Sequence, residues 1–163
     1  MLPEYSRKIR VAKNKRTEIK KFLQRLKKAR PSDLDLQSRI LHEKAFEGID
    51  CLKCANCCKT TGPLLLDKDI DKLAESQGMR PSDFTEKFLR IDEDRDYVFK
   101  HLGCPFLDMN NYCTVYNDRP NACREYPHTD QRKMINKLEI TAKNAEICPA
   151  VAEVVEGLMK VYR

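Results

Sequence analysis

The stretch CLKCANCC, residues 51–58, places four of the chain's eight cysteines within eight residues. The C-x-x-C spacing lets two sulfurs converge on one ion while the amides of the turn remain free to donate to them. Two overlapping steps in one loop supply several ligands at little loop-closure cost. Side chains of neighbouring residues rarely point the same way. We therefore expect the adjacent Cys57 and Cys58 to bind different metals or opposite sides of one cluster. The stretch predicts a thiolate metal centre around which the fold is organised.

The other four cysteines are spread over residues 104–148. Cys104 and Cys148 are each followed by proline, which lacks an N–H and shapes the backbone leaving a ligand; a Cys-Pro step also ends the bacterial ferredoxin run. The first three cysteines of CLKCANCC match the ferredoxin spacing, but the fourth is adjacent rather than four residues along. Four thiolates suit zinc and also an iron–sulfur cluster. Two four-ligand sites are one interpretation, although nothing local decides the partition. The other is that only some cysteines bind metal and the rest are small buried hydrophobes.

Charge divides the 163-residue chain unevenly. Residues 1–30 carry 12 Lys/Arg and two acids, a balance of 12 − 2 = +10, and residues 31–163 carry 19 basic and 23 acidic side chains, a balance of −4. No apolar run approaches the roughly 20 residues that a membrane helix needs, and the N-terminus has no apolar signal region. These features predict a cytoplasmic protein without a membrane span. In that compartment a high cysteine density favours metal over disulfides.

The basic segment is predicted to be helical and to end at Pro31. Its apolar residues recur at three- and four-residue spacing on one face: Tyr5, Ile9, Ala12, Ile19, Phe22, Leu23 and Leu26. Ser32 or Asp33 is expected to cap a second helix closed by Gly48. The predicted inner face of this helix is Leu34, Leu36, Ile40, Leu41, Ala45 and Phe46. We therefore expect two parts, residues 1–48 as a basic amphipathic helical arm and residues 49–163 as a cysteine-cluster metal-binding domain.

The remaining pattern predicts short elements between polar turns. We expect a loop at residues 51–62, helices over 67–77 and 81–90, a strand at 97–99 and a hairpin at 106–115. Short helices are expected after Pro120 and around residues 134–138, and a final helix begins at Pro149. The predicted core face of that helix is Val151, Val154, Val155, Leu158 and Val161. The fold class is mainly α with short irregular β hairpins, a small domain stapled by metal with an N-terminal helical extension.

Ordered motifs make the chain resemble a known family. They are CxxCxxCC at 51–58, Cys-Pro-Phe-Leu at 104–107, CTVYNDRPNACREYP at 113–127 and Cys-Pro at 148–149. Together they resemble the YkgJ-type cysteine cluster family, whose members are described as candidate zinc- or iron-chelating proteins and often as iron–sulfur-cluster-containing proteins. Flagellin lysine N-methylases resemble the same family. By this resemblance the metal ligands are Cys51, Cys54, Cys57, Cys58, Cys104, Cys113, Cys123 and Cys148.

Polar side chains near the cysteines have two interpretations each. Arg119 and Arg124 would offset the negative charge of thiolates, or would form surface ion pairs with Asp118 or Glu125. With eight cysteines available, we expect His101 and His128 not to be ligands and His42 to be a packing or surface residue. Acidic residues 67, 69 and 71 form a weak candidate cation site, but helix capping explains them more simply.

The sequence leads to three hypotheses of function. The first is a cytosolic protein holding zinc or an iron–sulfur cluster in a structural or redox role, with a metal or cluster and a further protein as partners. The second is a metalloenzyme or accessory in protein modification of the methyl-transfer kind, although no nucleotide motif is present and too little chain remains for a Rossmann methyltransferase domain. The third is a nucleic-acid-associated metal protein using the arm. We favour packing of the arm on its own body over nucleic acid or membrane contact. Two metal sites, each with a formal charge of −2, would bring the net charge of residues 31–163 from −4 to −8, beside the +10 of residues 1–30.

Overall fold

The computed structural model describes all 163 residues, and its contacts divide the chain into two compact units. Unit 1 comprises Met1–Cys54 and Pro127–Arg163, and unit 2 comprises Ala55–Tyr126. The regular structure consists of ten α-helices, two 3-10 helices and one two-stranded antiparallel sheet, which confirms a mainly α fold with short β pieces. The predicted division into a basic helical arm of residues 1–48 and a cysteine-cluster domain of residues 49–163 stays a prediction.

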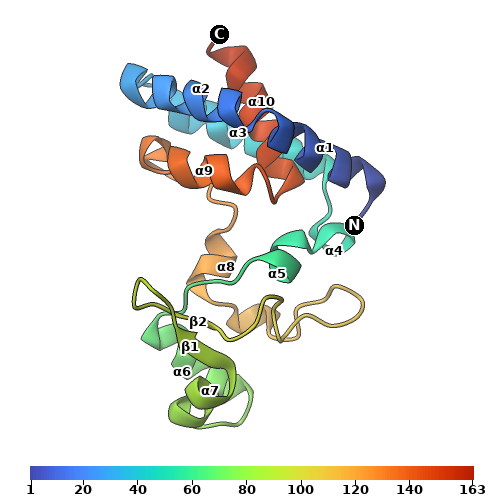
Figure 1. Cartoon of the computed structure of the whole chain (residues 1–163), viewed down its shortest axis with the longest axis vertical. Helices are drawn as coiled ribbons and strands as arrows, with labels where there is room; N and C mark the ends of the chain where they lie inside the picture. The colour runs from blue at the N-terminus through green and yellow to red at the C-terminus, as the bar shows by residue number, and fades with distance from the viewer. The chain divides into compact units, whose positions relative to one another are not determined.

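Unit 1 is a bundle of helices around the C-terminal helix α10 (Figure 1). Its long elements are α1 (Pro3–Asn14), α2 (Arg16–Ala29), α3 (Leu34–Gly48), α9 (Leu138–Asn144) and α10 (Pro149–Val161), joined by α4 (Cys51–Cys54) and a 3-10 turn, η2 (Met134–Asn136). Helix α10 packs on α1, α3 and α9, and α2 packs on α9. Four of its five predicted core residues are fully buried, but Val161, in the last turn, is 47% exposed. No helix of the chain is long and apolar enough to cross a membrane.

The basic N-terminal segment packs on its own unit through its apolar side. All seven residues of the predicted stripe are buried, with exposures of 2–6%. The helix is interrupted once, at Lys15, whose backbone (φ −93°, ψ 12°) leaves the helical range and separates α1 from α2. Because α1 contacts α10 and α2 contacts α9, the favoured interpretation of the arm as a packed element is confirmed.

Helix α3 buries a narrower face than we expected. Leu34, Ser38 and Ala45 are buried, whereas Leu36 and Ile40 are each 47% exposed. The buried positions follow the helical repeat from Leu34, and Leu36 lies two residues, or about 200°, around the helix from it. The prediction of Leu36 and Ile40 as inner residues is therefore wrong. A polar residue, Ser38, occupies the buried face in their place.

Unit 2 is built around an aromatic core. Its elements are α5 (Asn56–Thr60), α6 (Asp67–Ser76), α7 (Pro81–Phe88), β1 (Leu89–Ile91), β2 (Tyr97–Phe99), η1 (Tyr116–Asp118) and α8 (Asn121–Glu125). Phe84 is fully buried, and its ring stacks on that of Phe106 with centroids 6.1 Å apart. Phe88 and Phe99 contact the same Phe106 ring at 5.3 Å and 5.9 Å. Phe106 lies two residues after Cys104, so this core holds one cysteine segment in place.

The two paired strands lie at other residues than the predicted hairpin. The predicted strand at 97–99 is confirmed, and it pairs antiparallel with β1, which the sequence pattern did not indicate. Residues 106–115 form a single bridge between Leu107 and Cys113 in place of two paired strands. Asp108 accounts for the tight turn between them, because its side chain accepts N–H groups of Asn110 and Tyr112 at 2.8 Å and 2.9 Å.

The cysteine stretch is helical where a loop was expected. Helix α4 spans Cys51–Cys54 and helix α5 spans Asn56–Thr60. Between them Ala55 has a left-handed backbone, with φ of 47°. This conformation is uncommon for a residue with a side chain. The loop prediction for residues 51–62 is therefore wrong over most of its length.

Candidate metal centre

The eight cysteines are divided between the two units, and none forms a disulfide. Unit 1 carries Cys51 and Cys54 at the two ends of α4, and Cys148 directly before α10. Unit 2 carries Cys57 and Cys58 on α5, Cys104 after β2, Cys113 in the single bridge, and Cys123 on α8.

Backbone hydrogen bonds draw three cysteine segments of unit 2 together. The Cys104 N–H donates to the Cys58 carbonyl at 2.7 Å, which joins the segment after β2 to α5. The bridge from Leu107 to Cys113 folds the next segment back, and the Thr114 N–H donates to the Phe106 carbonyl at 2.8 Å. Cysteines at positions 58, 104 and 113 are thereby placed by main-chain pairing rather than by flexible side chains.

A buried carboxylate anchors the fourth segment. Asp69, on the first turn of α6, accepts the Leu66 N–H at 2.9 Å and the Asn121 N–H at 3.0 Å. The first bond caps α6, as the sequence predicted for this acidic turn. The second holds the beginning of α8, the short helix that carries Cys123. Asp69 therefore has a positioning role that no local sequence signal indicated, because its second partner lies 52 residues away.

The thiols of unit 2 are close enough to influence one another's ionisation. Burial and, to a lesser extent, the neighbouring thiols of Cys104, Cys58 and Cys113 together raise the pKa of Cys123 to about 12. Burial also raises the pKa of Cys104 to about 11, again with contributions from Cys58 and Cys113. Each thiolate would destabilise the next, so these buried thiols are neutral without a cation among them. The four sulfurs thus form one electrostatic group.

Cys58 differs from its neighbours. A hydrogen bond from the Cys57 thiol, together with the nearby cations Arg119 and Lys59, lowers the pKa of Cys58 to about 7. The Arg119 guanidinium lies over the Tyr116 ring at 3.6 Å from its centroid, and its Nε donates to the Tyr116 carbonyl at 2.9 Å. The alternative Arg119 ion pair with Asp118 is not formed, and Asp118 pairs with Lys72 at 3.7 Å instead. Arg119 therefore acts as a fixed cation beside the thiols.

Unit 1 holds a smaller group. Burial and, to a lesser extent, the thiols of Cys51 and Cys54 together raise the pKa of Cys148 to about 11. The backbone amides of Val151 and Ala150 act in the opposite direction and favour the Cys148 thiolate. Three sulfurs are therefore neighbours at the start of α10.

Both Cys-Pro steps share a feature that the sequence reasoning missed. The amides two and three residues after each cysteine favour its thiolate, Phe106 and Leu107 for Cys104, and Ala150 and Val151 for Cys148. Proline, the intervening residue, has no N–H and holds φ near −65°, which directs the following amides back toward the sulfur. The signal was present in the repeated Cys-Pro dipeptide.

The donor set fits a thiolate-bound metal, although the side chains are not drawn into a closed ligand set. No three or more Cys, His, Asp or Glu side chains meet at ligand spacing as they stand. Neutral buried thiols have no reason to converge further, whereas a cation that replaces their protons would offset the repulsion between sulfurs. Four sulfurs from cysteine suit tetrahedral zinc and an iron–sulfur cluster equally.

The histidines lie in other surroundings. His42 Nδ1 is 2.8 Å from Thr129 Oγ1, and its ring contacts Phe46 at a centroid distance of 4.6 Å. This confirms His42 as a packing residue of unit 1. His101 is exposed, and His128 Nδ1 lies 3.3 Å from Gln131 Nε2.

Comparison with known proteins decides the family. The model of the family CxxCxxCC, described as "Putative zinc- or iron-chelating domain", matches residues 50–149. The chain belongs to the CxxCxxCC family. The matched segment includes all eight cysteines, from Cys51 to Cys148, and the suspected family is confirmed. The description supports a metal cofactor for this CxxCxxCC protein without specifying zinc or iron. Neither a curated protein nor a solved structure gives a significant match.

Proposed function

We propose that this CxxCxxCC protein is a cytosolic metal-binding protein that holds zinc or an iron–sulfur cluster through cysteine thiolates, in a structural or redox role. One observation carries the proposal: in unit 2 the thiols of Cys104, Cys58 and Cys113 all contribute to the raised pKa of Cys123, although 65 residues separate Cys58 from Cys123. A bound cation would favour the thiolate form of these neighbouring groups and offset the repulsion between the thiolates, which supports metal binding. A reducing compartment keeps such thiols available as ligands.

In unit 2 the proposed ligands are Cys58, Cys104, Cys113 and Cys123. Zinc there would supply a redox-silent structural link, and an iron–sulfur cluster would supply electron transfer. The chain's own residues define the site by hydrogen bonds and charge. Asp69 holds the α8 segment, the Phe106 and Leu107 amides favour the Cys104 thiolate, and Arg119 offsets negative charge. The metal would join α5, the bridged segment and α8, which otherwise share few buried side chains.

In unit 1 the proposed ligands are Cys51, Cys54 and Cys148. A metal would join α4 to the start of α10, the helix at the centre of the core. Cys57 continues the C-x-x-C spacing of the first two cysteines in sequence, while its thiol donates to Cys58 in the structure. It stays a predicted ligand without an assigned group.

The test is anaerobic purification followed by elemental analysis and an absorption spectrum. Variants Cys104→Ser and Cys148→Ser should each lose a separate fraction of the metal, and the double variant should lose the sum. Met109→Ser, at a position 99% exposed in the segment before Cys113, is the matched control and should keep all metal. Iron with acid-labile sulfide excludes zinc, and stoichiometric zinc in a colourless protein excludes the cluster. Metal-free protein with all thiols oxidised in cells contradicts the proposal.

A second candidate function is a metalloenzyme, or an accessory in protein modification such as methyl transfer. The observation that favours it is the group of three thiols in unit 1, of which Cys51 is exposed. A metal with three protein ligands keeps a coordination position for substrate, whereas four cysteines close a structural site. Cobalt substitution followed by addition of a small exogenous ligand distinguishes them. A changed visible spectrum supports the open site, and an unchanged one supports a structural role.

A further inference from the structure

Helices α1 and α2 carry many Lys and Arg side chains, which stay exposed to solvent when the helices pack on the rest of unit 1. Eleven of the twelve Lys and Arg residues among residues 1–30 are exposed, and Lys8 is half-buried. Three of them pair with acids of α9, α10 or the segment between: Lys8 with Glu153, Arg16 with Glu146 at 3.0 Å, and Lys27 with Glu139 at 2.9 Å. The other nine have no acidic partner at ion-pair distance: Arg7, Arg10, Lys13, Lys15, Lys20, Lys21, Arg25, Lys28 and Arg30.

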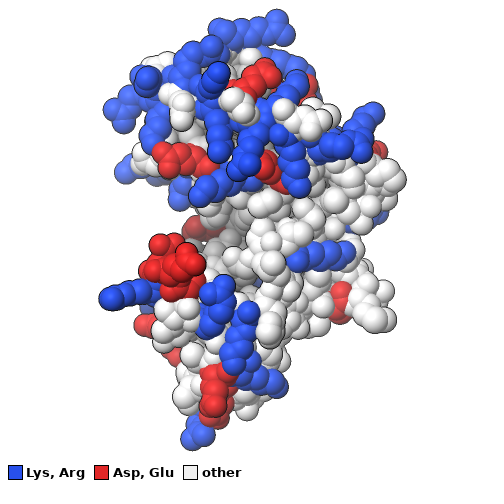
Figure 2. All heavy atoms as spheres, viewed as in Figure 1, with Lys and Arg blue, Asp and Glu red and all other residues white.

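This result differs from the charge balance inferred from the sequence. A net charge of +10 beside an acidic body suggested that the arm's cations are neutralised by packing. The structure shows that packing uses the apolar stripe, which occupies the opposite side of each helix from most of the cations. In Figure 2, Lys and Arg side chains cover much of the visible face of unit 1, with fewer acidic side chains among them. We call the outward side of α1 and α2 the cationic face.

We propose that the cationic face binds the phosphate backbone of double-helical nucleic acid, without sequence preference. The proposal is independent of the metal function. Helices of 12 and 14 residues are about 18 Å and 21 Å long, which covers many phosphates of a duplex carrying one charge per ~1.7 Å. Between Ile19 and Ser32 there is no acidic residue to interrupt the face.

The composition of the face favours a duplex over other polyanions. A protein interface needs a buried apolar centre, yet Val11 is the one large apolar side chain within α1 and α2 that is exposed. A single strand needs aromatic stacking partners, but Tyr5 and Phe22 are 2% and 5% exposed. An interfacial membrane helix needs its apolar side in the lipid, and here that side is in the protein core.

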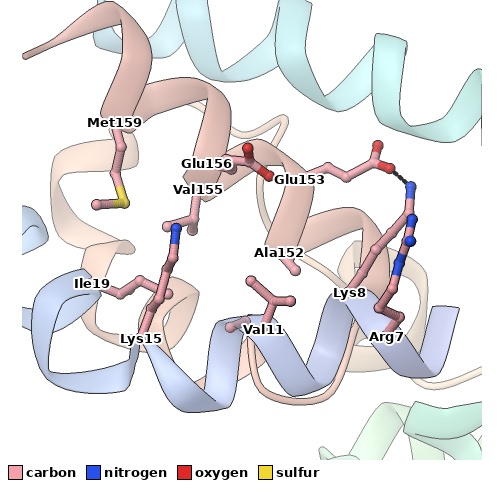
Figure 3. A pocket seen from close by; sticks show the side chains of 11 residues that line it. Arg7, Lys8, Val11, Lys15, Ile19, Ala152, Glu153, Val155, Glu156 and Met159 are labelled. Atoms are coloured by element: carbon pink, nitrogen blue, oxygen red, sulfur yellow. Dashed lines mark ion pairs between the residues drawn. The ribbon is translucent and has the colours of Figure 1, made fainter. Parts of the chain in front are cut away.

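We do not expect the cavity beside α1 to bind the nucleic acid. A cavity of 480 Å³ lies between α1 and α10, and Figure 3 shows Val11 and Ile19 on one wall and Val155 and Met159 on the other. Glu153 and Glu156 also line it, and Lys8 is paired with Glu153. Arg7, Lys8 and Lys15 line the cavity too, so its charges nearly balance, and nucleic acid is expected on the outward side of the helices, where most of the unpaired cations lie.

The test is binding of the purified full-length protein to a labelled DNA duplex longer than two helical turns, measured by fluorescence anisotropy. About six phosphate contacts would give a log–log salt slope near −5, a loss of about 10³-fold in affinity between ~50 and ~200 mM salt. Two duplexes of unrelated sequence should bind equally. Neutralising Lys20, Lys21 and Lys28 to Gln should reduce the slope by about three and weaken binding more than about tenfold at low salt.

The matched control neutralises three exposed cations elsewhere, Lys44, Lys68 and Arg90, also to Gln. Both triple variants change the net charge by −3, so only the position differs. The control should bind like the unmodified protein, and circular dichroism should show both variants folded. Four results would overturn the proposal: no binding at low salt, equal losses in both variants, tighter binding to a single strand, or binding to phosphatidylserine vesicles with none to the duplex.

Discussion

Asp69 leads to a specific prediction, because its buried carboxylate accepts backbone N–H groups at the starts of two helices. Its Oδ2 accepts the Leu66 N–H at 2.9 Å at the start of α6, and its Oδ1 accepts the Asn121 N–H at 3.0 Å at the start of α8. The side chain belongs to a residue only 7% exposed, so water cannot easily replace either bond. Asp69→Ala should therefore destabilise unit 2 and loosen the segment that carries Cys123.

The magnitude follows from the two bonds. A hydrogen bond to a charged group contributes about 1.5–3 kcal/mol, and each N–H left without an acceptor in a buried place adds a desolvation penalty. We expect a loss of about 3–5 kcal/mol for Asp69→Ala. Asp69→Asn should lose about half as much, because the amide oxygen can accept one N–H while its NH₂ group faces the other donor.

The assay is urea denaturation of metal-loaded and metal-free protein, with hydrogen exchange of the Leu66 and Asn121 amides as a local readout. Asp67→Ala, an exposed residue on the first turn of the same helix, is the control and should cost less than about 1 kcal/mol. Chelator competition should show weaker metal retention by Asp69→Ala than by the control. A loss below about 1 kcal/mol for Asp69→Ala, or equal losses for Asp69→Asn and Asp69→Ala, would mean that the carboxylate of Asp69 does not hold the two helix starts.

Three further predictions concern ionisation and packing. In metal-free protein, Cys58 should be the first thiol alkylated by iodoacetamide, with a midpoint near its pKa of about 7, and metal should protect it; equal reaction of Cys123 would contradict this. A buried thiol whose pKa is raised, such as Cys123, stabilises the metal-free fold below its ordinary pKa of 9.0, and this stabilisation is lost as pH rises toward about 12. Thermal unfolding at pH 8 and pH 10 should show a falling Tm, and a rising Tm would argue against burial of the thiols. Gly157→Val should cost about 1–3 kcal/mol in denaturation, because a Cβ there would lie 2.5 Å from Leu41 Cδ2, whereas Gly48→Val meets no atom within 4 Å and should cost less.

Periodicity predicted the N-terminal helices well and α3 only in part. The stripe of α1 and α2 is unambiguous because its apolar residues stand among lysines and arginines. In α3 apolar residues occupy more than one face, and the buried side includes Ser38. The Ser38 hydroxyl donates to the Thr129 carbonyl at 2.6 Å, a partner 91 residues away. No local pattern indicates that a serine has such a partner, so the inner face could not be chosen from the sequence.

The β pairing shows the same limit. Tyr97–Phe99 has the composition of a strand and is one. Its partner Leu89–Ile91 directly follows α7, and only the antiparallel register Leu89 to Phe99 makes it a strand. Of the predicted hairpin at 106–115 only the bridge between Leu107 and Cys113 forms, and the ring of Phe106 packs into the aromatic core with Phe84.

The chemistry of this protein could be read from its residues alone: eight thiols, two Cys-Pro steps, the family, and a basic helix with one apolar side. These are local properties, set by residue type and by spacing along a few turns of chain. Tertiary structure decided which thiols are neighbours, that Asp69 and Arg119 support one group, and that the arm's cations remain outside. Those outcomes depend on hydrogen bonds and burial between segments 40 to 100 residues apart, such as Asp69 with Asn121 and Asp35 with Met134.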